Sequence, residues 1–365
     1  MKVAIKDLGE IITGNTPSKS IPDFWNSKDI YFIKPDIISD ENINYIKKSK
    51  EYISNIAEKK ARVVYGKAIF VTCIGSIGKI GVIESGKYAF NQQINAIVPN
   101  ENINIKYLAY NLLFNKKRLE AIANAPVVPI INKKQFGDFT INIERDKIKQ
   151  EKITKVLDKI SIIIDKRKQE LIQLDNLIQS RFVEMFGDPI TNSKLLPIEK
   201  IEERYFLKAG ITTKAEDIHD YLKDKYEIPC YGGNGIRGYV ENLSYEGCYP
   251  IIGRQGALCG NVQYATGKFH ATEHAVLVST LKNDNTMWVY YMLKLMDLYR
   301  YHTGAAQPGL AVKKLNTIDV IVADINLQNQ FAAFVHQINK SKFEVQKSLE
   351  KTQLLFDSLM QEYFG

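Results

Sequence analysis

Residues 180–187 of the chain read Ser-Arg-Phe-Val-Glu-Met-Phe-Gly, and residues 358–365 read Ser-Leu-Met-Gln-Glu-Tyr-Phe-Gly. These similar stretches lie about 180 residues apart in a chain of 365 residues. A repeat of this length is too long for a stacked solenoid, so it indicates two tandem copies of one module. Further pairs occur in the same order: Val3-Ala4-Ile5-Lys6-Asp7-Leu8 with Leu196-Pro197-Ile198-Glu199-Lys200-Ile201, Ile74-Gly75-Ser76-Ile77-Gly78 with Ile252-Gly253-Arg254-Gln255-Gly256, Gly86-Lys87-Tyr88 with Gly267-Lys268-Phe269, and Lys133-Lys134 with Lys313-Lys314.

The two matching stretches each end a region with a heptad pattern, in which eight of ten a/d positions are apolar. A period of 3.5 residues is typical of a coiled-coil helix. Where a position is polar in one copy, the equivalent position in the other copy is apolar, which favours pairing of the two helices within one chain. The a/d positions are Ile153, Leu157, Ile160, Ile164, Arg167, Leu171, Leu174, Ile178, Arg181 and Met185 in the first copy, and Phe331, Val335, Ile338, Lys342, Val345, Leu349, Thr352, Phe356, Leu359 and Tyr363 in the second.

The first helix is expected from about residue 145 to residue 186, because Gly187 and Asp188-Pro189 form a natural helix stop. The chain enters this helix from one globular half and leaves it into the next. The second helix must then return to meet the first, so we predict an antiparallel coiled coil with internal pseudo-twofold symmetry.

The globular halves, 1–144 and 188–324, have no long helical period. Short runs rich in Ile, Val, Tyr and Phe predict strands near residues 63–65, 68–71, 80–83, 249–252 and 275–278, and helices are expected near 105–123 and 288–301. The predicted fold class is α+β, with two mixed, β-rich domains in tandem, each followed by a long helix. The predicted divisions are 1–144, 145–187, 188–324 and 325–365.

The chain carries a formal net charge of +8 and a pI of about 9.0, which favours an anionic partner such as nucleic acid. With 45% hydrophobic residues it can bury a core. The four cysteines have no zinc-site spacing, so we expect reduced thiols in a cytosolic protein. The first residues show no signal-peptide pattern, and no window of 18 uncharged apolar residues predicts a membrane span.

Several loops combine glycine, which permits close backbone approach, with side chains that can contact bases or phosphates. The two copies agree in scaffold and differ at these polar positions, as expected of domains that read different half-sites. Ordinary polar loops and a solvated charged face are the alternatives. The candidate DNA-binding residues are Thr16, Lys19, Ser76, Lys79, Asn91, Gln92, Gln93, Lys133, Lys134, Thr212, Lys214, Tyr231, Asn234, Arg237, Arg254, Gln255, Thr272, Glu273, His274, Gln307, Lys313 and Lys314.

Motifs for chemistry are absent from the sequence. It contains no Walker A loop, H-E-x-x-H, G-x-S-x-G, amino-methyltransferase or complete nuclease motif. The five histidines form no ligand pattern. Gly233, Gly235 and Gly238 match G-x-G-x-x-G, but Tyr239-Val240 reads as a strand where a nucleotide-binding fold needs a helix. These absences agree with a recognition role, and we expect a non-catalytic chain without a metal or cofactor of its own.

The chain resembles the specificity (S) subunits of type I restriction–modification systems along essentially its whole length. The resemblance rests on Gly14-Asn15-Thr16-Pro17-Ser18-Lys19, on residues 231–240 and 253–260, on Ala306-Gln307-Pro308-Gly309-Leu310, and on Glu184-Met185-Phe186-Gly187-Asp188-Pro189. It departs from the family pattern in the first half, where Pro126-Val127-Val128-Pro129 replaces Ala306-Gln307-Pro308-Gly309 and the 233–238 turn has no clear counterpart.

The resemblance implies two target recognition domains, each reading one half of a bipartite asymmetric site in double-stranded DNA. It implies helices that set the distance between half-sites and dock two methyltransferase subunits for adenine methylation, with restriction/motor subunits completing the complex. S-adenosylmethionine, ATP and Mg would belong to those partners. The alternatives are a coiled-coil scaffold whose globular ends bind proteins, and a solitary enzyme with a diverged site.

Overall fold

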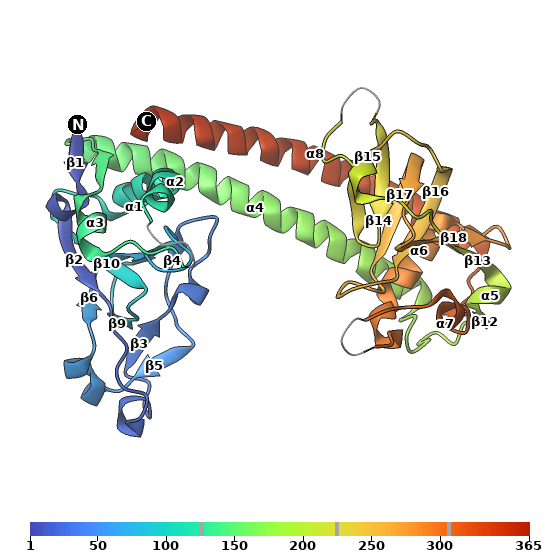
Figure 1. Cartoon of the computed structure of the whole chain (residues 1–365), viewed down its shortest axis with the longest axis horizontal. Helices are drawn as coiled ribbons and strands as arrows, with labels where there is room; N and C mark the ends of the chain where they lie inside the picture. The colour runs from blue at the N-terminus through green and yellow to red at the C-terminus, as the bar shows by residue number, and fades with distance from the viewer. Residues whose placement is uncertain (124–127, 223–225, 305–307) are drawn as a thin grey trace. The chain divides into compact units, whose positions relative to one another are not determined.

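The longest elements are two helices, α4 (Lys147–Phe186) and α8 (Ile325–Phe364) (Figure 1). Their bounds agree with the expected helices to within two residues. All twenty residues at the predicted a/d positions are buried or half-buried, so the heptad pattern does mark the covered stripe of each helix. Gly187 follows α4 with a φ of 79°, and its amide donates to Val183 O at 2.8 Å. This left-handed glycine ends the helix as predicted.

The computed structural model describes residues 1–123, 128–222, 226–304 and 308–365. The chain divides into two compact units, one of Met1–Lys166 with Ser348–Gly365 and one of Arg167–Lys347. Each unit therefore holds one half of α4 and one half of α8. The limits 1–144 and 188–324 for the recognition domains stay a prediction. Among the described residues, no helix is both long and apolar enough to cross a membrane.

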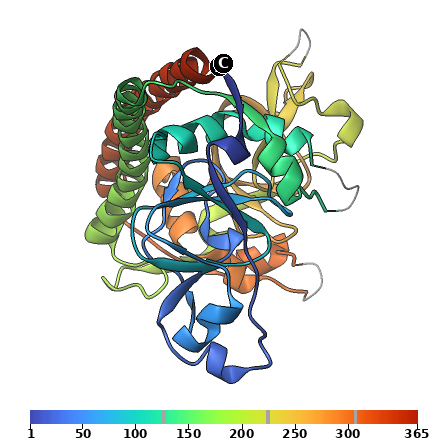
Figure 2. The ribbon, with the colours of Figure 1, turned by 90° about the vertical axis from the view of Figure 1, so that its left-hand side faces the viewer.

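In the first unit, the start of α4 lies beside the end of α8 (Figure 2). Tyr107 links the two helix ends, since its hydroxyl accepts from Glu144 N and its ring lies 5.2 Å from that of Phe364. Further along, Tyr110 donates to Asp158 at 2.8 Å and its ring lies 6.2 Å from that of Phe356. The two segments thus run antiparallel.

The second unit has the same arrangement. The ring of Phe331 on α8 lies 5.3 Å from Phe182 and 5.8 Å from Phe186 on α4. Asp175 and Lys342, which lie further from these ends, form an ion pair at 2.6 Å. The helix segments are therefore antiparallel in this unit as well.

The first unit contains a five-stranded sheet and a four-stranded sheet that share a buried apolar layer. Helices α1 (Ile105–Phe114), α2 (Lys116–Ala121) and α3 (Lys133–Asp138) pack with α4 and α8 in a second layer against the larger sheet. The larger sheet has the order β2 (Gly9–Thr13), β10 (Ile94–Pro99), β7 (Ala68–Thr72), β8 (Ile80–Ile83) and β4 (Asn44–Tyr45), and the smaller has β5 (Glu51–Ile53), β3 (Ile30–Ile33), β9 (Lys87–Phe90) and β6 (Val63–Tyr65); β1 (Lys2–Ala4) pairs with β11 (Thr140–Asn142).

The second unit contains one six-stranded sheet and a short pair of strands. Helices α5 (Ile201–Arg204), α6 (Thr286–Leu295) and α7 (Val312–Asn316) contribute to its core with α4 and α8. The sheet has the order β13 (Tyr205–Ala209), β18 (Ala275–Thr280), β16 (Tyr245–Gly253), β17 (Val262–Ala271), β14 (Ile228–Gly232) and β15 (Gly235–Val240), and β12 (Ile198–Lys200) pairs with β19 (Asp319–Ile321).

The two units share hydrogen bonds at equivalent positions of the sequence repeat. In the first unit, Gln150 of α4 accepts from Asn104 N at 2.8 Å and donates to Glu144 O at 2.7 Å. In the second, Gln328 of α8 accepts from Asn285 N at 2.9 Å and donates to Ala323 O at 3.0 Å. Each long helix is therefore tied to its sheet domain by the same buried glutamine, which supports the tandem-module prediction.

The same comparison corrects the register of three predicted matches. Gly75 N donates to Pro129 O and Gly256 N donates to Pro308 O, so Gly75 corresponds to Gly256 rather than to Gly253. The match between the first strands is wrong by three residues. The amides of Ile5 and Ile201 donate to the equivalent carbonyls of Phe139 and Ile318, so Ile5 corresponds to Ile201. Helix α3 begins at Lys133 and α7 at Val312, so Lys134 corresponds to Lys313.

Candidate nucleic-acid interface

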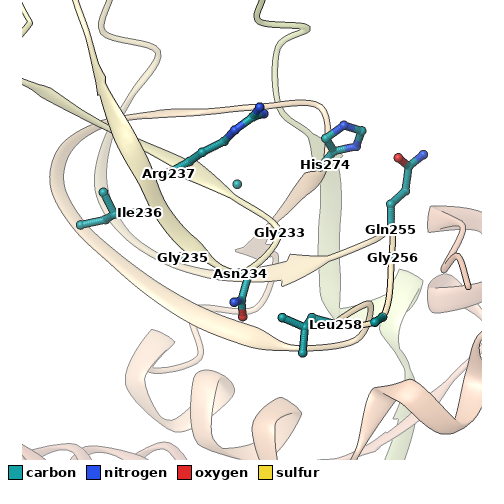
Figure 3. Close-up of a pocket in the computed structure, with 11 residues that line it drawn as sticks. Gly233, Asn234, Gly235, Ile236, Arg237, Gln255, Gly256, Leu258 and His274 are labelled. Carbon is teal, nitrogen blue, oxygen red and sulfur yellow. The ribbon is translucent and has the colours of Figure 1, made fainter. Parts of the chain in front are cut away.

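The glycine-rich segments of the second unit are loops that connect its strands, and these loops lie together. Arg254 N donates to His274 O at 3.0 Å, which joins the β16–β17 loop to the β17–β18 loop. Thr272 N donates to Tyr231 O at 2.9 Å, which joins that loop to the end of β14. Backbone bonds therefore hold three loops that are distant in sequence as one surface (Figure 3).

A cavity of about 530 Å³ opens among these loops. Figure 3 shows Arg237, Gln255 and His274 around it, from three different segments. Asn234 and Arg237 are exposed and come from the β14–β15 hairpin. Arginine can bind the guanine edge with two hydrogen bonds, and Asn or Gln the adenine edge. The hairpin replaces the helix that a nucleotide-binding motif would need, so the G-x-G-x-x-G match is structural, as the sequence indicates.

Glu273 connects a further segment to this surface. Its carboxylate accepts from Thr213 N at 3.2 Å and pairs with His274 Nε2 at 3.2 Å. The stretch that carries the exposed Thr212 and Lys214 is thereby attached to the β17–β18 loop. The His274 Nδ1 atom is buried and has no hydrogen-bond partner within the described ranges.

The first unit has a matching frame of loops. Cys73 N donates to Gln93 O at 2.7 Å, and Asn91 N donates to Ile33 O at 3.1 Å. Ser76 and Gln92 are exposed on these loops. Thr16 donates to the Gln92 side chain at 2.9 Å, which ties the segment after β2 to the same edge. The backbone frame is shared, whereas the exposed side chains differ between the units.

Two of the candidate residues face the interior. Thr272 is fully buried and Asn91 is 7% exposed, and the two occupy equivalent positions directly after β17 and β9. Asn91 donates to the Gln93 side chain at 2.7 Å, which positions the loop. Tyr231 is half-buried against the Phe269 ring, and burial raises the pKa of its phenol. We therefore leave Asn91 and Thr272 out of the proposed base-contacting surface.

A family model described as "Type I restriction modification DNA specificity domain" matches residues 1–176 and 206–354. The chain belongs to this family. It is 32% identical to the EcoprrI specificity subunit of Escherichia coli, over 89% of this chain and 84% of that one. The MjaIX specificity subunit of Methanocaldococcus jannaschii is 21% identical, over 98% and 90% of the two chains.

Solved structures share the fold of this specificity-family chain. The S subunit of a type I restriction–modification system from M. genitalium aligns with a TM-score of 0.64 at 17% identity, over all of this chain and 96% of that one. A second structure, from work on complex assembly and conformational transition of the type I system, aligns with a TM-score of 0.59 at 14% identity, over all of this chain and 97% of that one. Type I specificity subunits are the non-catalytic members of their systems.

The lysines of this specificity subunit lie on separate surfaces. Lys133 and Lys134 are exposed in the first turn of α3, beside a hollow of about 610 Å³ that β2 also lines. Lys313 and Lys314 are exposed on α7, and Lys314 lines a different hollow of about 360 Å³. Lys19 is exposed over the Trp25 ring, and Lys79 is half-buried. Gln307 falls outside the described residues.

The sequence did not single out two apolar side chains at the second unit's cavity, Ile236 and Leu258. Both are exposed and line the opening beside Arg237. Exposed apolar side chains at such an edge can contact a thymine methyl group. Nothing in the local sequence pattern distinguishes them from core residues. Their exposure depends on how β15 and the β16–β17 loop pack.

Proposed function

We propose that this type I specificity subunit reads a bipartite, asymmetric site in double-stranded DNA, with one half read by residues 1–144 and the other by residues 188–324. The observation that carries this proposal is the equivalent loop frame in both units, bearing different exposed side chains. Ser76 and Gln92 occupy one frame, and Gln255 and Arg237 the other. A shared frame with changed polar contacts can read two different sequences on the same geometry.

Affinity for the DNA backbone would come from the basic side chains. The net charge of +8 and the exposed lysines at positions 19, 133, 134, 214 and 313 support phosphate contacts. Such contacts fix the position of a protein on a duplex, whereas base-edge contacts determine which sequence it prefers. Binding should therefore weaken as salt concentration rises.

The helices would set the distance between half-sites and dock two methyltransferase subunits. At 1.5 Å per residue, a helix of 40 residues spans roughly 60 Å. Large apolar side chains stay exposed on both helices, including Phe343 at 65% and Ile172 at 61%. We take these exposed side chains as the candidate contacts for a partner subunit. Methylation of adenine, restriction and the use of S-adenosylmethionine, ATP and Mg would belong to the partner subunits.

The test is to replace residues 1–144 with the corresponding domain of another family member and to sequence the methylated DNA of cells that express the chimaera with its methyltransferase. One half of the methylated motif should change, while the other half and the spacer stay constant. Changes in both halves would refute the assignment of one half-site to each domain. Methylation unrelated to this chain would instead favour the scaffold alternative.

A further inference from the structure

The segment after β3 in the first unit corresponds to the glycine turn of the second. Strand β3 pairs in parallel with β9, with Ile33 opposite Phe90, as β14 pairs with β17, with Tyr231 opposite Ala271. The next amide of each partner strand, Asn91 N or Thr272 N, donates to the carbonyl of Ile33 or Tyr231. Lys34-Pro35-Asp36 therefore occupies the place of Gly232-Gly233-Asn234.

The two connections differ in length, which hides this correspondence in the sequence. In the second unit, Gly232 and Gly235 pair across a two-residue turn and the chain enters β15. In the first unit, the chain passes through a 3-10 turn (Pro35–Ile37) and β4 before it returns as β5. A loop with a different length and composition has therefore been placed on the same edge of the domain.

This turn holds the backbone of Asp36 in place and leaves its side chain exposed. Pro35 begins the turn, Ile37 N donates to Lys34 O at 3.3 Å, and Ile38 N donates to Pro35 O at 3.2 Å. Ile38 is buried, and Lys34 forms an ion pair with Glu51, so both ends of the turn are anchored. Asp36 is exposed and forms no hydrogen bond or ion pair with the described part of the chain.

We propose that Asp36 is a specificity-determining residue of the first domain, accepting a hydrogen bond from the exocyclic amino group of a cytosine in the major groove. This inference rests on the proposed function. A carboxylate beside DNA is repelled by phosphates, so it is favourable only where it meets an amino donor. It therefore excludes guanine and thymine, which present a carbonyl oxygen at that position, and it disfavours adenine, whose N7 acceptor lies beside its amino group.

The experiment uses the full-length chain assembled with its methyltransferase partner and a duplex library that is randomised across the methylated motif. Asp36→Asn and Asp36→Ala are compared with Glu101→Gln. Glu101 is an exposed carboxylate that follows β10 at the end of that strand opposite the reading loop, so it matches the charge change without the location. Sequencing of the methylated fraction gives the preference at every position.

Both Asp36 variants should lose preference at one position in one half of the motif, by about tenfold to a hundredfold. The other half, the spacer and the Glu101→Gln motif should be unchanged. Because Asp36 is exposed, thermal unfolding should also be unchanged, and the Asn variant keeps the shape of the side chain.

An unaltered motif in both Asp36 variants would overturn the inference, as would a loss spread evenly over all positions. Two further variants, Gln92→Ala and Arg237→Ala, distinguish failure of the Asp36 inference from failure of the proposed function. If either of these changes its half of the motif while the Asp36 variants do not, only the Asp36 inference fails. If none of the variants alters the motif, the proposed function fails as well.

Discussion

At the scale of single residues, the two units solve the same packing problem in different ways. Arg204 and Asp284 form a buried ion pair with two contacts, at 2.5 and 2.6 Å, and Gln328 donates to Asp284 at 2.7 Å. The backbone bond from Leu281 N to Arg204 O has its equivalent in the bond from Asn100 N to Leu8 O. In the first unit, apolar Leu8 and Ile103 thus occupy the positions of this ion pair.

Removal of Arg204 alone should destabilise the second unit strongly. Arg204→Leu leaves the Asp284 carboxylate buried without its cation, at a cost of about 3–5 kcal/mol in the free energy of unfolding. The double variant Arg204→Leu/Asp284→Ile copies the first unit and should recover most of that loss. Denaturant unfolding measures both variants. Lys200→Leu, which breaks an exposed ion pair with Asp319 at 3.1 Å, is the control and should cost less than about 1 kcal/mol. Equal losses in all three would contradict this account.

Base contacts and phosphate contacts should respond differently to substitution. Arg237→Ala is expected to cost about 1–3 kcal/mol of discrimination at one position of one half-site. Lys313→Ala should weaken binding to all sequences alike and lower the salt dependence by about one phosphate. Titration of the complex with matched and mismatched duplexes at several salt concentrations separates the two effects. A uniform loss from Arg237→Ala would remove it from the base-reading surface.

Residue-level features of the site were only partly predictable from the sequence. The glycine loops could be located, but their register could not, because Gly75 and Gly78 have the same spacing as Gly253 and Gly256. A match based on glycine spacing therefore selects Gly253 for Gly75, whereas the backbone hydrogen bonds place Gly75 with Gly256. The burial of Asn91 and Thr272 was also missed, because a polar residue directly after a strand can face either way until the loop bonds are known.

At the scale of elements, the long helices were the most predictable part of the chain. A heptad pattern sustained from Ile153 to Met185 has only one regular structure that keeps its apolar side chains on one stripe. The strand predicted near residues 249–252 is the end of the longer β16, and its partner β17 was not predicted. Their pairing to each other extends beyond the apolar core. The connection after β3 was not predictable, since its length differs from that of its counterpart.

Two phenylalanines of α8 test the difference between its covered and exposed faces. Phe331 is fully buried against Phe182 and Phe186, so Phe331→Ala should lower the free energy of unfolding by about 3–5 kcal/mol. Phe343→Ala is the matched control on the same helix, and it should change stability by less than about 0.5 kcal/mol. Phe343→Ala should instead weaken binding of the methyltransferase subunit, measured by titration. Normal partner binding by a stable Phe343→Ala protein would exclude that side chain from the docking surface.

At the scale of the whole molecule, duplication of one module explains why the two units share a scaffold and differ in their exposed loop residues. The glutamines Gln150 and Gln328 tie equivalent helices to equivalent sheets, while the exposed loop residues differ between the units. Family membership follows from the match over residues 1–176 and 206–354 rather than from any single motif. The bases that are read depend on loop geometry and on the shape of the DNA, which no residue pattern in the sequence specifies.

In the proposed function, this chain determines which bipartite site is methylated. The most direct test of this role is methylome sequencing of the source cell with the gene intact, deleted and restored. We predict that deletion abolishes one split adenine-methylation motif and that restoration returns the same motif. An identical set of methylated motifs in the intact and deleted strains would contradict the account.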